Sequence, residues 1–272
     1  MKSQSLLFTL IFQCFSCFGY TVLKPDPYPA SGNIARWRDE LKMGSEERIR
    51  EDQEPETGST ECIEMAEIPN AFLCLSYLQE TMNRIFYRAS LFAEGGKDRN
   101  RGAILPLSSN DYAKGLVLAK GHDLTFADLR AFFSLNEPLN VHEMEFRDQI
   151  WNKLAERSEG VILGFSIQNV ASYEDAVSHE ALHAQFFLND RLREAVTDFY
   201  TKALSVAHRT VAERELGRFY NTNDIPVMAN EVFAYLLQRN ANRWHLRELV
   251  QPCARQLLDY LETRELNVQI IY

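Results

Sequence analysis

The feature that most constrains this chain is residues 178–183, which read Ser-His-Glu-Ala-Leu-His. They contain the pattern His-Glu-x-x-His at His179, Glu180 and His183. On an α-helix, side chains four residues apart lie on one face about 5–6 Å from each other, so the two imidazoles can bind one metal ion. Glu180 lies beside that face, where its carboxylate can accept a proton from a water molecule that the metal activates. The spacing therefore predicts a metal site suited to hydrolysing an amide.

The motif is predicted to lie on a buried helix. Ser172 is a suitable N-cap with an acidic residue three positions later, and neither Gly nor Pro follows before residue 189. Most side chains of residues 176–188 are apolar, which indicates a helix in the interior. Buried imidazoles and carboxylates are costly unless they are paired or bind a metal, so we favour metal binding over histidines that are only hydrogen-bonded in a core.

The first 62 residues are predicted to precede the folded domain. Lys2 is followed by a mostly apolar run at residues 6–18, which is too short to span a bilayer but has the length of a signal-peptide core. We therefore expect a signal peptide at residues 1–19 and export of the chain. Cys17 is also a candidate for a lipid anchor. Residues 20–62 are acidic and contain several prolines, which predicts an extended lead-in.

The remaining residues, 63–272, are long enough and apolar enough for one domain with a full core. The net charge of −9 argues against a nucleic-acid partner, and no later segment is apolar enough to be a transmembrane segment. Cys62 and Cys74 are the nearest cysteine pair of this part, with Cys253 further on, and spacing alone does not decide the pairing.

Periodicity predicts an α+β fold that is mostly helical with a small sheet. We expect a strand at residues 160–167, whose edge is available to an extended peptide unless it serves packing alone. The other expected strand is at residues 115–119, and the expected helices are at residues 70–92, 123–135 with Thr125 as N-cap, 141–157, 172–188, 191–216 ended by Gly217, 227–237 opened by Asp224, and 246–264.

His179, Glu180 and His183 on one helix, followed by Asn230-Glu231-x-x-Ala234 on a later helix, resemble the gluzincin group of zinc metallopeptidases. The resemblance covers these two segments and their order. It implies that His179, His183 and Glu231 bind one Zn²⁺ ion and that Glu180 is the general base. It also implies a zincin-like metallopeptidase fold, with a sheet in the N-terminal part, the metal-binding helix at a cleft and a helical C-terminal subdomain.

Further residues are candidates for supporting roles. Tyr235 is one turn after Glu231 and is our candidate catalytic donor to the oxyanion, with Tyr220 and His245 as alternatives. Asp198 or Glu194 is expected to orient a ligand histidine through a hydrogen bond. Four residues compete with Glu231 for the third ligand position: Asp190, Glu194, Asp198 and His208.

The function predicted from these residues is that of an exported zinc metallopeptidase acting on a peptide or protein substrate. Two alternatives stay open. In the first, the chain is an exported helical interaction domain in which the motif is inert. In the second, it is a zinc amidase that acts on cell-wall amides.

Overall fold

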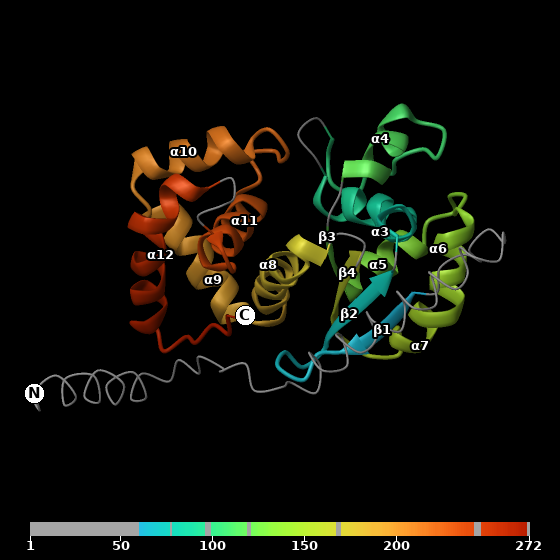
Figure 1. Cartoon of the computed structure of the whole chain (residues 1–272), viewed down its shortest axis with the longest axis horizontal. Helices are drawn as coiled ribbons and strands as arrows, with labels where there is room; N and C mark the ends of the chain where they lie inside the picture. Colours follow the sequence, from blue (N-terminus) through green and yellow to red (C-terminus); the bar gives the residue numbers. More distant parts are fainter. Residues whose placement is uncertain are drawn as a thin grey trace, which may run out of the picture.

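The computed structural model describes residues 60–76, 78–95, 99–118, 121–166, 170–241 and 246–270. The predicted signal peptide, Cys17 and nearly all of the lead-in lie outside the described residues. The described part has two halves, a mixed one built on a sheet and a helical one, with helix α8 (Val170–Leu188) between them (Figure 1). The class is α+β with a predominance of helix, as the sequence predicts.

The sheet has four strands in the order β1-β2-β4-β3. Strands β1 (Glu61–Glu64) and β2 (Ala71–Ser76) are antiparallel, β2 and β4 (Val161–Ser166) are parallel, and β3 (Gly121–Thr125) is antiparallel to β4. Cys62 and Cys74 are opposite one another in β1 and β2 and form a disulfide. Strand β3 is at an edge of the sheet and contacts α8, so this edge strand lies beside the predicted metal site.

Helices cover both faces of the sheet. One face packs on α3 (Gln79–Glu94), α5 (Phe126–Phe133) and the helical segment made by α6 (Val141–Phe146), η1 (Arg147–Trp151) and α7 (Asn152–Leu154). The other face packs on α8 through small side chains such as Ala181 and Ala184. Small side chains let the helix approach the sheet closely, so residues of α8 and β3 come into contact.

The C-terminal half is a cluster of helices around one apolar core. Its helices are α9 (Asp190–Asp198), η2 (Phe199–Ala203), α10 (Val206–Leu216), α11 (Ile225–Leu237) and α12 (Arg247–Glu262). Helix α11 is buried along nearly its whole length and packs against both α8 and α12. The helix α4 (Asn110–Leu118) belongs to the other half and packs on α3. Among the described helices, none has the length and apolar character that a membrane crossing requires.

Several predicted boundaries are wrong. Residues 71–76 form strand β2 rather than the start of a helix, because a short, fully buried apolar run has no periodicity that separates strand from helix. Residues 115–118 belong to α4 rather than to a strand. Helix α8 begins at Val170, so Ser172 is not its N-cap. Strand β4 pairs on both sides, so its edge is not available to a peptide.

The predicted single helix at residues 191–216 is divided into two parts. The backbone of Leu204 is extended, with φ −67° and ψ 127°, and Ser205 starts α10 by accepting a hydrogen bond from the His208 amide. Serine is a favourable N-cap residue, so position 205 carries a sequence signal for this helix start. The predicted caps Thr125, Asp224 and Gly217 are at their expected helix ends.

Candidate metal centre

Helix α8 brings the two motif histidines to the boundary between the halves. Their side chains lie one turn apart on the same face, and the Nε2 atoms of His179 and His183 are 3.0 Å from each other. The imidazole of His183 is almost fully buried, and that of His179 is largely so. Two ring nitrogens at this distance can bind one ion between them.

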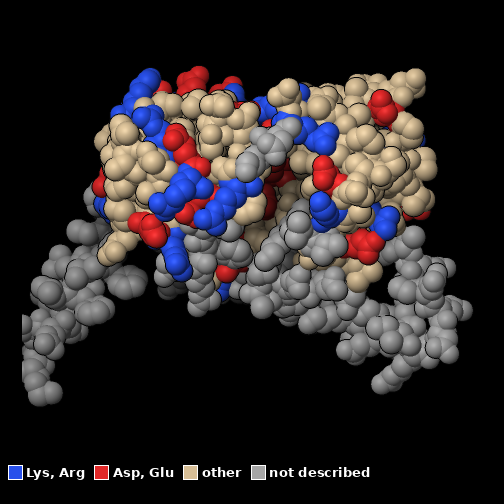
Figure 2. All heavy atoms as spheres, turned by 90° about the horizontal axis from the view of Figure 1, so that it is seen from above, with Lys and Arg blue, Asp and Glu red and all other residues tan. Residues whose placement is uncertain are grey.

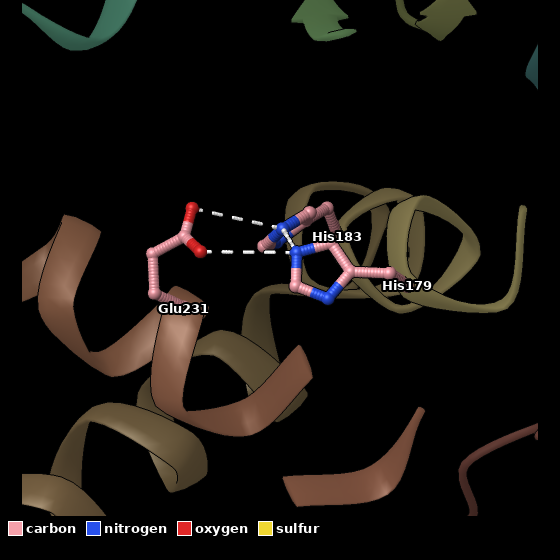
Figure 3. A group of neighbouring side chains, drawn as sticks. All are labelled: His179, His183 and Glu231. Atoms are coloured by element: carbon pink, nitrogen blue, oxygen red, sulfur yellow. Dashed lines mark hydrogen bonds and ion pairs between the residues drawn. The ribbon is translucent and has the colours of Figure 1, made fainter. Parts of the chain in front are cut away.

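Helix α11 supplies the third group. Asp224 caps this helix by accepting from the amide of Val227, and Pro226 lies in its first turn. Two turns later the carboxylate of Glu231 faces both imidazoles, with Oε2 3.8 Å from His179 Nε2 and Oε1 3.7 Å from His183 Nε2 (Figure 3). A tetrahedral ion with bonds of about 2.0–2.1 Å separates its ligand atoms by about 3.3–3.4 Å. The observed separations of 3.0–3.8 Å lie on either side of this value, so small side-chain shifts would let the three groups hold one ion.

Burial makes this arrangement unfavourable without a cation. Glu231 Oε2 is buried and has no hydrogen-bond partner among the described residues. Burial raises the pKa of Glu231 to about 7, and the charge of His183 opposes that rise. A hydrogen bond from Tyr220 also lowers the pKa of Glu231, although burial dominates. A metal ion at this position would supply the positive charge that the carboxylate lacks.

Gln238 fixes the orientation of the first histidine. Its Oε1 atom is 2.6 Å from Nδ1 of His179, so Nδ1 carries the proton and donates it to the amide oxygen. The lone pair of the other nitrogen, Nε2, then points at the candidate site, 3.0 Å from Nε2 of His183. The sequence analysis did not name Gln238. Gln238 is seven residues, or about two helical turns, after Glu231, so the two are expected on the same helix face. This spacing is the signal that could have suggested it.

Glu180 lies beside the candidate site and faces strand β3. Its carboxylate is buried against Gly121, where an added Cβ would overlap Oε1 of Glu180. Burial raises the pKa of Glu180 above its ordinary value, and the neighbouring carboxylates of Asp123 and Glu231 raise it further. A carboxylate in this environment is a better proton acceptor than one in water.

These groups line a cavity of about 620 Å³. Figure 2 shows a hollow between the two halves with acidic side chains inside it. The polar residues that line the cavity include Glu94, Asp123, Asp175, Glu180 and Glu231, while Tyr87, Leu91 and Phe219 provide apolar walls. The lining of the cavity thus combines charged groups with apolar ones, as ligand-binding sites commonly do.

Two tyrosines also reach the cavity. The ring of Tyr235 packs on His179 with the ring centroids 4.5 Å apart, and Tyr220 hydrogen bonds to Glu231. Burial raises the pKa of both hydroxyl groups, and nearby carboxylates add to the effect, so both remain protonated donors at neutral pH. His245, the other candidate donor, lies outside the described residues.

The four rivals of Glu231 have other partners. Asp190 is largely exposed and pairs with Arg193, and Glu194 is exposed on α9. Asp198 pairs with Lys202 at 2.7 Å. His208 Nδ1 is 3.2 Å from the Cys253 sulfur in the helical core. The prediction that Asp198 or Glu194 orients a ligand histidine is therefore wrong, because α9 directs both carboxylates away from the motif.

Sequence analysis missed the contribution of β3 and α3. Asp123, Glu180 and His183 form a second group of potential ligand atoms, and Asp123 hydrogen bonds with Glu94. Burial and the charge of Asp123 raise the pKa of Glu94 well above its ordinary value. Only the long-range pairing of β3 with β4 brings these residues to α8, and no local pattern predicts that pairing.

Comparisons with protein-family models, curated proteins and solved structures found no match to this chain. The geometry of the candidate site is therefore the basis for inferring what this chain does.

Proposed function

We propose that this chain is an exported zinc metallopeptidase of the gluzincin type that hydrolyses peptide bonds. The observation that carries the proposal is the convergence of His179 Nε2, His183 Nε2 and the Glu231 carboxylate within 3.0–3.8 Å, from two helices far apart in sequence. Two imidazoles and one carboxylate are a common ligand set of catalytic zinc. The small sheet, the central α8 and the helical C-terminal half agree with the mostly helical α+β class that we expect for such an enzyme.

The roles of the residues follow from their positions. A zinc ion held by His179, His183 and Glu231 would lower the pKa of a water molecule to about 7 and polarise a substrate carbonyl. Glu180 would accept the proton of the attacking water and pass it to the leaving amine. Tyr235, which stays protonated in the cavity, would donate a hydrogen bond to the oxygen that becomes negatively charged.

Export is supported by the disulfide between Cys62 and Cys74, since disulfides persist mainly outside the reducing cytosol. The apolar run at residues 6–18 has the length of a signal-peptide core, which agrees with this compartment. The substrate class that we propose is an extended peptide or protein, because the cavity opens between the two halves beside an edge strand.

Two variants test the proposal on purified protein. Glu180→Gln keeps the size of the side chain but cannot take a proton, so we expect stoichiometric zinc and loss of peptide hydrolysis. Glu231→Ala should weaken zinc binding by far more than about 100-fold, the upper end of the loss expected for a residue outside the ligand set. Metal content and turnover are measured on the same preparations, with Glu194→Ala and His208→Ala as controls that retain zinc.

The outcomes separate the proposal from its competitors. Zinc bound by the wild type without hydrolysis of any peptide would favour an inert motif in an interaction domain. Hydrolysis of cell-wall amides but not of peptides would favour an amidase. Tight zinc binding by Glu231→Ala would exclude the gluzincin ligand set.

A further inference from the structure

The two motif histidines differ in what their second ring nitrogen contacts. Nδ1 of His179 donates to Gln238, whereas Nδ1 of His183 is buried and has no hydrogen-bond partner among the described residues. When Nε2 of His183 binds a metal ion, Nδ1 carries the ring proton, and a buried N–H without a partner is unfavourable. Asp123 Oδ2 lies 3.9 Å from this nitrogen. That distance is too long for a direct hydrogen bond, and a bridging water or a small rotation of either side chain would complete the contact.

We infer that Asp123 is a positioning residue for His183. Its carboxylate accepts the Nδ1–H proton of His183 and holds the imidazole with Nε2 directed at the metal site. This inference rests on the proposed function, because it assigns a role within the proposed zinc site. Asp123 and Gln238 then act in parallel, one for each ligand histidine, and they come from opposite halves of the molecule.

Strand β3 places Asp123 on the correct side. Side chains of a strand alternate between its faces, so Gly121 and Asp123 both face α8. Gly121 meets Glu180 and Asp123 meets His183, which are three residues apart on α8 and thus on neighbouring parts of one helix face. Two alternate residues of β3 therefore face two residues that are about one turn apart on α8.

The intervening residue holds the strand in place. Asn83 donates through Nδ2 to the carbonyl of Leu116, so its Oδ1 accepts from Nε2 of His122 at 2.8 Å. With Nε2 protonated, Nδ1 of His122 accepts from the hydroxyl of Ser90 at 2.8 Å. Both nitrogens of this buried imidazole are satisfied by side chains of α3, so His122 connects β3 to α3 next to Asp123.

Glu94 gives the Asp123 carboxylate a further restraint. It is the last residue of α3 and hydrogen bonds with Asp123. The side chain of Asp123 is 9% exposed, which leaves little room for its carboxylate to turn toward solvent. Asp123 therefore remains close to His183, whereas Asp198 and Glu194, the residues expected for this role, lie on the outer side of α9.

The experiment compares metal affinity among carboxylate-to-amide variants of the full chain. We expect Asp123→Asn to lower Zn²⁺ affinity about 10–100-fold in a competition titration with a chelator, which is the loss typical of a residue that orients a metal ligand. The cobalt(II)-substituted protein should also show shifted visible absorption bands, because His183 is no longer held in one orientation. Glu194→Gln and Asp198→Asn are matched controls and should keep wild-type affinity and spectrum. Thermal unfolding of the metal-free variants verifies that each is folded.

The possible results of this experiment lead to different conclusions. Wild-type affinity and an unchanged cobalt spectrum in Asp123→Asn would overturn the inference while leaving the metal site intact. An affinity loss far beyond 100-fold would mean that Asp123 itself binds the metal, which also overturns the positioning role. If the wild-type protein does not bind zinc and His183→Ala makes no difference, the proposed function fails instead. Should Asp123→Asn not fold, Asp123→Ala, which removes the carboxylate, is measured in the same way, and wild-type affinity and spectrum in that variant would overturn the inference.

Discussion

Gly121 of β3 lies directly against the carboxylate of Glu180 in α8. The space that a side chain at position 121 would occupy is filled by Oε1 of Glu180. Both residues belong to the lining of the same cavity. The edge strand thus determines how close the proposed general base lies to the metal site, and the absence of a side chain at Gly121 is what permits this position.

The first prediction concerns Gly121→Ala. The added methyl group would push the Glu180 carboxylate away, so turnover should fall by about 100-fold or more while zinc remains bound, since a displacement of about 1 Å at a reacting group has that effect. Kinetic constants and metal content are measured together. Gly164→Ala is the control, because its methyl group would crowd Phe86 on the opposite face of the sheet. It should lower stability without the specific loss of turnover, and equal turnover losses in the two variants would contradict the prediction.

A second prediction separates the two cavity tyrosines. Tyr220 hydrogen bonds to Glu231, so Tyr220→Phe should weaken zinc binding about 10–100-fold, as expected when a partner of a metal ligand is lost. Tyr235 packs on His179, and it is our candidate donor to the oxyanion. Tyr235→Phe should therefore leave zinc affinity close to the wild-type value and lower kcat about 100- to 1000-fold.

The measurement for this pair is the zinc dissociation constant together with steady-state kinetics at saturating zinc. The two variants serve as controls for one another, since each removes a single hydroxyl group from the same cavity. The opposite pattern, with turnover lost in Tyr220→Phe at full zinc occupancy, would transfer the donor role to Tyr220.

The parts of the site that the sequence predicted are those encoded within single helices. The spacing of His179 and His183 and the cap at Asp224 before Glu231 are local patterns with a helical period, and the structure brings these three potential ligands together. Gly121, Asp123 and Gln238 were not predicted. Gly121 and Asp123 depend on how β3 pairs with β4, and Gln238 depends on how α11 packs on α8.

Errors in the predicted fold have a similar origin. A buried strand such as β2 has apolar residues at every position, so its pattern is also compatible with a helix, and only its place beside β4 decides. The division between η2 and α10 could have been predicted from Ser205, which is a good N-cap within a segment of otherwise helical character. Local rules thus predicted the helix ends better than they predicted the sheet.

The last prediction concerns pH and the metal-free protein. Burial raises the pKa of Glu231 to about 7 from its ordinary 4.5, so the folded state binds a proton at this residue more tightly than the unfolded state does. The contribution of Glu231 to the free energy of unfolding is therefore largest below about pH 4.5 and falls as the pH rises toward 7. A shift of this size corresponds to a loss of about 3 kcal/mol.

Glu231→Gln isolates that contribution, because the amide has the same shape and does not titrate. The free energy of unfolding is measured by denaturant titration with a chelator present, at pH 5 and pH 8, for the wild type and the variant. Relative to Glu231→Gln, the wild type should lose about 2.5 kcal/mol between these two values, because part of the loss already occurs below pH 5. Glu194→Gln, at an exposed position, should follow the wild type. Excess zinc at pH 8 should remove the loss in the wild type, since a bound cation stabilises the ionised carboxylate. A difference between wild type and Glu231→Gln that stays constant with pH would mean that Glu231 is not held as a buried carboxyl group, and would remove the main electrostatic reason for a metal at this position.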